Sequence, residues 1–218
     1  MATLSDFGIA TGAFIAERDD WHAAVTRATA NGYYHLELTA ITLERLDQLL
    51  PFLAEQSAAL DPFERVSIHA PANEARDSTP AVIVELARLN DAFDIVLHPD
   101  VYMSEPSVWH LGGRAVFENM DCQKDFGRTT TDLESVFSTF PAAGFCLDVA
   151  HVWTNDPTLG LAHELIDRLG HRLRQLHVSG IADDGTHRPT TTADLELYEP
   201  VLARCRQVPW LLETELVG

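Results

Sequence analysis

Eight side chains that can bind a divalent metal ion stand at or just beyond the ends of short apolar runs in this sequence. The runs have the length and apolar character of buried strands. Polar residues that follow one parallel strand after another come together at one end of the sheet. Imidazoles and carboxylates gathered in this way can hold metal, so the pattern predicts a metalloenzyme. The eight residues are His69, His98, Glu118, Asp148, His151, His177, His187 and Glu213.

Two of these residues, Asp148 and His151, follow a single apolar run, Gly-Phe-Cys-Leu, and lie three positions apart. An aspartate at a strand end points into the mouth of a barrel, and a histidine in the next turn can reach the same ion or a neighbouring one. The alternative is an aspartate that caps a helix and a histidine on the surface. Likewise, His177 and His187 flank a polar loop, where histidines can simply be solvated.

Glu118 and Glu213 each close an apolar strand-like run. A buried carboxylate needs a cationic partner or a raised pKa, and a divalent ion supplies the first. A structural ion pair is the alternative for either glutamate taken alone. The recurrence of ligand types at equivalent strand ends favours the metal site.

Strand-like and helix-like segments alternate along the chain, which predicts a parallel sheet with helical crossovers. Eight strands in 218 residues indicate an α/β fold, a compact (β/α)8 TIM barrel, with residues 1–218 as a single domain. The expected strands are residues 7–11, 33–38, 66–69, 94–98, 115–118, 145–148, 173–177 and 210–213.

Amphipathic segments lie between these strands and predict helices that pack on the sheet. The crossover at residues 99–113 is short and contains Pro106, so a single helical turn is expected there. Only five residues follow the last strand, so we expect the last helix of the barrel to be missing. Apolar surface left open there favours a homodimer. The expected helices are residues 20–31, 42–59, 79–90, 131–137, 159–169 and 193–205.

The chain is strongly acidic, with 15 Lys and Arg against 33 Asp and Glu and a formal net charge of −18. Such a surface repels phosphate backbones, which disfavours nucleic acid as a partner. Cys122, Cys146 and Cys205 are widely spaced and form no Cys-x-x-Cys pair, which indicates a reducing compartment. We find neither a signal peptide nor a membrane-spanning run, so a cytoplasmic protein without a membrane partner is expected.

Six motifs occur in order between residues 67 and 215: IHAP, LHP, FENMD, CLDVAH, LHVSG with a following THRP, and WLLETE. They resemble the xylose isomerase-like TIM-barrel superfamily, which includes sugar-phosphate isomerases and epimerases and endonuclease IV. Resemblance to the isomerases implies one divalent ion held by Glu118, Asp148, His177 and Glu213. It also implies that the two glutamates are the acid/base pair, which moves a proton between neighbouring carbons of a sugar or sugar phosphate through a metal-bound enediolate.

Four residues are expected to contact this small-molecule substrate. The resemblance implies that His151 binds a substrate oxygen and that Glu37, at the end of the second strand, is a further polar contact. Arg188, which adjoins His187, is the first candidate for binding a phosphate group, and Lys124 is another. The alternatives are a structural acid for Glu37 and, for Arg188, a loop arginine paired with Asp183 or Asp184.

The resemblance to endonuclease IV covers all eight candidate ligands and implies a phosphoester hydrolase with three zinc ions. Where the Asp-x-His pair of that enzyme should begin, this chain has Gly185, with Asp183 or Asp184 as substitutes. The acidic charge and the lack of DNA-binding insertions disfavour an abasic-site endonuclease. The HVSG and GTHRP segments are also similar to multinuclear iron-dependent oxidative enzymes that modify peptides.

The donor set is compatible with Mn, Zn or Fe, and also with Co or Mg, as one to three ions. Two classes without catalysis stand beside the enzymes: a barrel that only binds a small ligand, and a structural metal protein. A closed structural site needs about four ligands, whereas this mouth offers up to eight. The sequence therefore favours a metal-dependent isomerase or epimerase.

Overall fold

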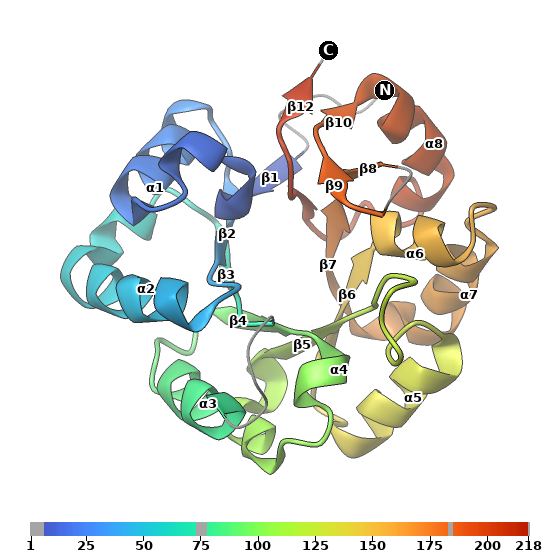
Figure 1. The fold of residues 1–218 in the computed structure, drawn as a ribbon, viewed down its shortest axis with the longest axis horizontal. Coiled ribbons are helices and arrows are strands. Elements are labelled where there is room, and N and C mark those ends of the chain that lie inside the picture. Colours follow the sequence, from blue (N-terminus) through green and yellow to red (C-terminus); the bar gives the residue numbers. More distant parts are fainter. Residues whose placement is uncertain (1–6, 73–77, 183–184, 218) are drawn as a thin grey trace.

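The computed structural model describes residues 7–72, 78–182 and 185–217. Eight parallel strands close a barrel that helices surround, as the sequence predicts (Figure 1). Strands β1 to β7 follow one another around the barrel, and β11 pairs with both β7 and β1 to close it. The barrel strands are β1 (Phe7–Ala10), β2 (His35–Thr39), β3 (Arg65–His69), β4 (Asp94–Leu97), β5 (Ala115–Glu118), β6 (Gly144–Asp148), β7 (Leu173–Val178) and β11 (Trp210–Leu212).

All eight expected strands are present within two residues of their predicted ends, and the six expected helices are confirmed. The crossover between β4 and β5 contains one turn of α-helix, α4, followed by a 3₁₀ helix at Pro106–Arg114. Among the described residues, α6 is the one α-helix outside the predicted set. The α-helices are α1 (Trp21–Ala30), α2 (Leu43–Gln56), α3 (Thr79–Ala87), α4 (Pro99–Tyr102), α5 (Thr130–Thr139), α6 (Val149–Asn155), α7 (Gly160–Leu169) and α8 (Thr192–Leu202).

Side chains along each barrel strand alternate between the outer helices and the barrel interior. In β5, the ring of Phe117 packs on Phe137 of α5 with ring centroids 6.5 Å apart. Its neighbour Val116 instead joins Val96 and Cys146 in an apolar cluster that is separate from the main core. Counting by twos from this inner cluster places the following strand-end residues toward the mouth: His98, Glu118 and Asp148.

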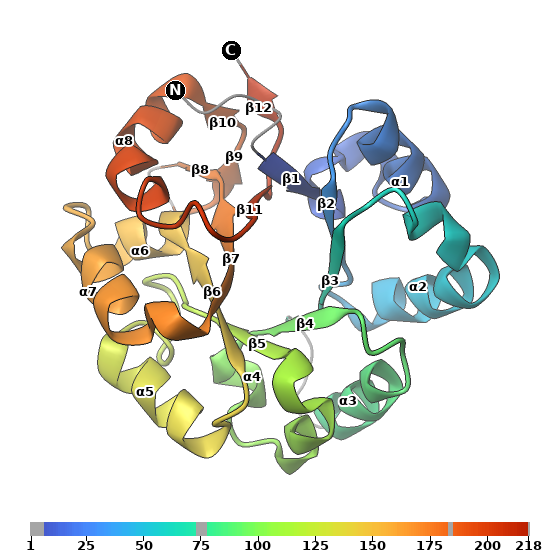
Figure 2. The same cartoon turned by 180° about the vertical axis from the view of Figure 1, so that it is seen from behind.

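At the edge of the molecule where β11 pairs with β1, described residues from both ends of the chain lie together (Figure 2). After β11 the chain forms β12 (Leu216–Val217), which pairs with β10 (Thr190–Thr191). Phe7 is fully buried, and its ring meets that of Trp210 edge-on at a centroid distance of 5.7 Å. Arg27 adds ion pairs to Glu17 and Glu215 across this edge. Homodimer formation stays a prediction.

No helix among the described residues has both the length and the apolar character needed to cross a membrane.

Helix α8 begins at a capping box that also anchors a short hairpin, β8 (Gly180–Ile181) with β9 (His187–Arg188). The Thr191 hydroxyl accepts the amide of Asp194 at 3.3 Å, and the Asp194 carboxylate accepts the amide of Thr191 at 2.8 Å. The same carboxylate receives both terminal nitrogens of Arg188 at 2.8 Å. Asp194 therefore ties the hairpin above β7 to the helix that follows it.

We expect Asp194→Ala to lower the free energy of unfolding by about 1 to 3 kcal/mol, because it removes a cap and the partner of Arg188. Burial raises the pKa of Asp194, but hydrogen bonds from Arg188 and Thr191 outweigh it and lower the pKa. The contribution is thus complete above the unfolded-state pKa near 3.8 and is lost as pH falls through the lower folded-state value. Urea unfolding at pH 7 and pH 3 measures both effects.

Glu196→Ala, at an exposed position of the same helix, is the matched control and should change stability by less than about 0.5 kcal/mol. An Asp194→Ala protein as stable as the Glu196→Ala protein would contradict the anchoring role.

Candidate metal centre

Six of the eight predicted ligands form two groups at the carboxyl ends of the barrel strands, and the groups share one carboxylate. Within each group, the potential ligand atoms all lie within 4.8 Å of one another. Two donors at about 2.0–2.3 Å from one ion lie at most about 4.6 Å apart, so either group would need only a small adjustment to surround an ion. The first group is His69, His98 and Glu118, and the second is Glu118, Asp148, His177 and Glu213.

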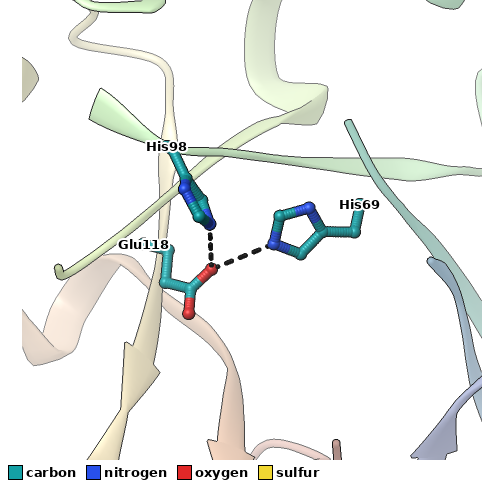
Figure 3. Close-up of side chains that lie close together, drawn as sticks. All are labelled: His69, His98 and Glu118. Carbon is teal, nitrogen blue, oxygen red and sulfur yellow. Dashed lines mark hydrogen bonds and ion pairs between the residues drawn. The ribbon is translucent and has the colours of Figure 1, made fainter. Parts of the chain in front are cut away.

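In the three-residue group, two imidazoles point at one oxygen of Glu118 (Figure 3). The Nε2 atoms of His69 and His98 lie 3.3 and 3.5 Å from Glu118 Oε2. The other nitrogen of His69, Nδ1, lies 3.0 Å from the carbonyl oxygen of Ala70. A proton on Nδ1 that is donated to this carbonyl leaves the Nε2 lone pair of His69 free to bind a metal.

In the four-residue group, two carboxylates meet at one imidazole nitrogen. His177 Nδ1 lies 3.2 Å from Glu118 Oε1 and 3.2 Å from Glu213 Oε1. Asp148 Oδ1 accepts the amide of His151 at 2.6 Å and so caps α6. Among the described residues, Asp148 Oδ2 is buried without a hydrogen-bond partner. Asp148 therefore caps a helix with one oxygen and keeps the other available for an ion.

The pKa values of the three buried carboxylates depart from their usual values in different directions: those of Glu118 and Glu213 are lowered, and that of Asp148 is raised. Burial raises the pKa of Glu118, but attraction and hydrogen bonding by histidines, His177 foremost, hold it well below its usual value. The pKa of Glu213 is lowered in the same way, against burial, by His177. The pKa of Asp148 is raised well above its usual value by burial and by the two neighbouring glutamates. Adding positive charge here would favour three ionised carboxylates.

The donor set fits a divalent cation. Asp148 Oδ2 and Glu213 Oε2 are buried oxygens without hydrogen-bond partners in the described part of the chain. Buried acids in that state are costly unless a cation or a proton compensates them. Mixed carboxylate and imidazole ligands suit Mn, Zn or Fe. Glu118, Asp148, His177 and Glu213 are thus the residues that would hold an ion, with His69 and His98 able to hold a second one beside Glu118.

The remaining two predicted ligands, His151 and His187, lie next to this centre but outside both groups. His151 Nδ1 lies 2.9 Å from the carbonyl oxygen of Asn119, and its ring meets that of His187 edge-on at 5.5 Å. His187 Nδ1 is 3.5 Å from Glu213 Oε2, and 35% of its side chain is exposed. Asp183 and Asp184, the proposed companions of His187, lie outside the described residues.

Asn119 is a site residue that sequence reasoning did not single out. Its side-chain amide donates to the carbonyl of Asp148 at 2.9 Å and accepts the amide of Asp148 at 2.8 Å. This pair of bonds continues the β5–β6 pairing by one side chain and fixes the backbone that carries Asp148. Together with the carbonyl contact to His151, it makes Asn119 the link between β5 and the start of α6. The FENMD motif was the available signal.

The four predicted substrate contacts have different surroundings. His151 lies at the mouth, whereas Glu37 has no exposed surface. Strand β2 extends to Thr39, which pairs with His69, so Glu37 lies one layer below the strand-end ligands. Lys124 Nζ lies 3.2 Å from Asp100 Oδ2, and Lys124 lines a surface pocket of about 370 Å³.

Arg188 is paired, but not with the loop acids named as the alternative. Both of its terminal nitrogens bind Asp194, and its Nε donates to the carbonyl of Ile181 at 3.1 Å. This placement favours a role in anchoring the β8–β9 hairpin. Phosphate binding by Arg188 stays an untested prediction.

Comparison with solved structures relates this fold to known barrels. Endonuclease IV from Thermus thermophilus aligns with a TM-score of 0.59 and 17% identity, over 97% of this chain and 91% of that chain. A xylose isomerase-like TIM barrel protein from Mycobacterium smegmatis, in complex with magnesium, aligns with a TM-score of 0.54 and 12% identity, over 97% and 91%. The chain shares the TIM-barrel fold of these proteins.

A sugar phosphate isomerase/epimerase from Parabacteroides distasonis ATCC 8503 shares this fold, with a TM-score of 0.54 and 13% identity over 100% of this chain and 90% of that chain. No protein-family profile matches the sequence, and a search of curated proteins found no match. The resemblance drawn from the six motifs is thus confirmed at the level of the fold. These identities are too low to transfer an activity.

Because Glu118 belongs to both groups, Glu118→Gln should weaken metal binding more than loss of a ligand from one group. We expect Mn²⁺ affinity to fall by more than about 100-fold in Glu118→Gln. This is more than the loss seen when a residue that only hydrogen-bonds to a ligand is replaced, which is about 10- to 100-fold. His98→Ala should leave binding at the four-residue group close to wild type. Isothermal titration of metal-stripped protein gives the affinity and the number of ions.

The matched control is Glu85→Gln, at an exposed helix position paired with Arg88. Wild-type Mn²⁺ affinity in Glu118→Gln would place the centre elsewhere.

Proposed function

We propose that this protein is a divalent-metal-dependent enzyme that removes a proton from a carbon beside the carbonyl of a sugar or sugar phosphate and returns a proton either to the neighbouring carbon, as an isomerase, or to the opposite face of the same carbon, as an epimerase. The observation that carries the proposal is the four-residue group, in which Glu118 and Glu213 approach the same atom, His177 Nδ1, from β5 and from the end of β11. Two further strands, β6 and β7, separate these glutamates around the barrel. The group thus offers two carboxylates flanking one ion position.

A divalent ion held by Glu118, Asp148, His177 and Glu213 would act as a Lewis acid that makes the C–H bond beside a substrate carbonyl more acidic. The glutamates would supply the base that takes this proton and the acid that returns one, to the adjacent carbon in an isomerase or to the opposite face of the same carbon in an epimerase. Glu213 is the more accessible of the pair, with 16% of its side chain exposed against 1% for Glu118. This greater accessibility to a substrate makes Glu213 our choice for the base.

The substrate would enter from the mouth, where His151 and His187 stand beside Glu213. His151 donates from Nδ1 to a backbone carbonyl, which leaves Nε2 to orient a substrate hydroxyl. The pocket that Lys124 lines adjoins the centre through Asp100, whose Oδ1 lies 4.0 Å from His98 Nδ1. We assign the phosphate of a phosphorylated substrate to Lys124, whose ammonium pairs with Asp100 and lines the pocket, in preference to Arg188, whose guanidinium makes two hydrogen bonds to Asp194 and one to Ile181.

Deuterium exchange tests the proton transfer across many candidate substrates in parallel. Metal-loaded protein is incubated in D2O with a panel of ketoses, aldoses and their monophosphates, and mass spectrometry measures carbon-bound deuterium. We expect exchange with at least one member. Glu213→Gln should slow it by roughly 10²- to 10⁴-fold, the usual contribution of an acid/base group.

Glu215→Gln is the matched control, because it makes the same change two residues away at a carboxylate that pairs with Arg27. It should exchange at the wild-type rate. Equal exchange in Glu213→Gln and wild type would remove Glu213 from the acid/base pair, and a metal-loaded wild type inert toward the whole panel would refute the isomerase proposal.

A second candidate, a multinuclear phosphoester hydrolase, is favoured by the donors beyond the four-residue group. His69 and His98 share Glu118 with that group, and His151 and His187 face each other beside Glu213. The net charge of −18 makes a small phosphodiester a better substrate than DNA. Elemental analysis separates the candidates: about one ion per chain supports the isomerase, whereas two or three zinc ions with hydrolysis of bis(p-nitrophenyl) phosphate support the hydrolase.

A further inference from the structure

Beneath the metal centre, a fully buried carboxylate is held by donors from two other strands. Glu37 Oε2 accepts the hydroxyl of Ser67, on β3, at 2.9 Å and the side-chain amide of Gln175, on β7, at 2.7 Å. Strands β2 and β7 are not neighbours, so the bond to Gln175 crosses the barrel interior. Glu37 has 0% exposed surface, which leaves it no direct route to solvent or to a substrate at the mouth.

The third donor to this oxygen is the imidazole of a candidate metal ligand. His177 Nε2 lies 3.1 Å from Glu37 Oε2 and 2.9 Å from the amide nitrogen of Gln175, while Nδ1 of the same ring faces Glu118 and Glu213 at 3.2 Å. An Nε2 that carries the proton donates it to Glu37, whereas an unprotonated Nε2 would accept a hydrogen bond from Gln175; a metal ion at Nδ1 requires the first arrangement. The ring stacks on that of His69, with centroids 6.1 Å apart and planes 24° from parallel. One nitrogen therefore points down to Glu37 and the other points up into the four-residue group.

We propose that Glu37 is a positioning residue of the metal centre, which accepts the Nε2 proton of His177 and so presents the Nδ1 lone pair to the ion. The proposal rests on the metal centre of the proposed function and adds to it a residue that touches neither the ion nor the substrate. A carboxylate behind a histidine ligand fixes its tautomer and ring orientation and makes its free nitrogen a stronger donor.

The rest of the barrel interior supports a specific role for this acid. On the side of β4, β5 and β6, the interior is filled by the apolar cluster of Val96, Val116 and Cys146. Apolar side chains alone can therefore fill the interior of this barrel, and a charged residue is not needed for packing. A buried carboxylate is costly unless it is paired and hydrogen-bonded. Of the three side chains that contact Glu37 Oε2, His177 is the one that also belongs to the four-residue group, so this contact connects Glu37 to the candidate metal centre.

The test is cobalt binding to metal-stripped Glu37→Gln, which keeps the volume of the side chain and removes its charge. We expect Co²⁺ affinity to fall by roughly 10- to 100-fold, with a shifted visible spectrum, because the His177 donor becomes weaker and less well oriented. Glu105→Gln is the matched control, since Glu105 also accepts hydrogen bonds, from Ser107 and Thr79, away from the centre. It should leave both the affinity and the spectrum unchanged.

Unchanged Co²⁺ affinity and spectrum in Glu37→Gln would overturn the positioning role alone, whereas a wild type that binds no Co²⁺ would overturn the metal centre itself. A second measurement does not depend on the variant folding. In ¹⁵N spectra of the zinc-loaded wild type, the imidazole of His177 should carry its proton on Nε2. A proton on Nδ1, or zinc bound at Nε2, would overturn the proposal.

Discussion

The candidate metal centre depends on the alternation of side chains along parallel strands that close into a barrel. Alternate residues point inward, so the residue at the end of each strand is directed to the same mouth. A chain with a metal-binding residue at this position in most strands concentrates imidazoles and carboxylates in a small buried volume. The short distances at Glu118, where four histidines lie within 3.5 Å of its two oxygens, follow from this geometry.

Three carboxylates gathered in one buried volume need positive charge or hydrogen bonds nearby to compensate them. The histidines stabilise the ionised forms of Glu118 and Glu213 and so lower the pKa values of these two residues. Burial and the same two carboxylates raise the pKa of Asp148. A divalent cation bound between them would compensate the negative charge of all three carboxylates. Two neighbouring residues hold the ligands in place without being ligands themselves. Glu37, one layer below, contacts His177, and the side chain of Asn119 makes two hydrogen bonds to the backbone of Asp148.

The strand ends were predictable from sequence because a short apolar run closed by a polar residue is a local signal. Helix α6 was not, because residues Val149 to Val152 are all buried and give no amphipathic stripe. The depth of Glu37 was misjudged because β2 continues to Thr39, and only the pairing with β3 reveals this register. The role of Asn119 and the pairing of Arg188 with Asp194 depend on contacts that sequence spacing does not encode.

We propose that Glu118, Asp148, His177 and Glu213 surround one ion. Anomalous diffraction from crystals soaked in Mn²⁺ tests it most directly, because it locates the ion without reference to activity. We predict a manganese peak within coordinating distance of all four side chains, with any second peak beside His69 and His98. A fully occupied manganese site elsewhere in the barrel, with these four side chains unliganded, would contradict the claim.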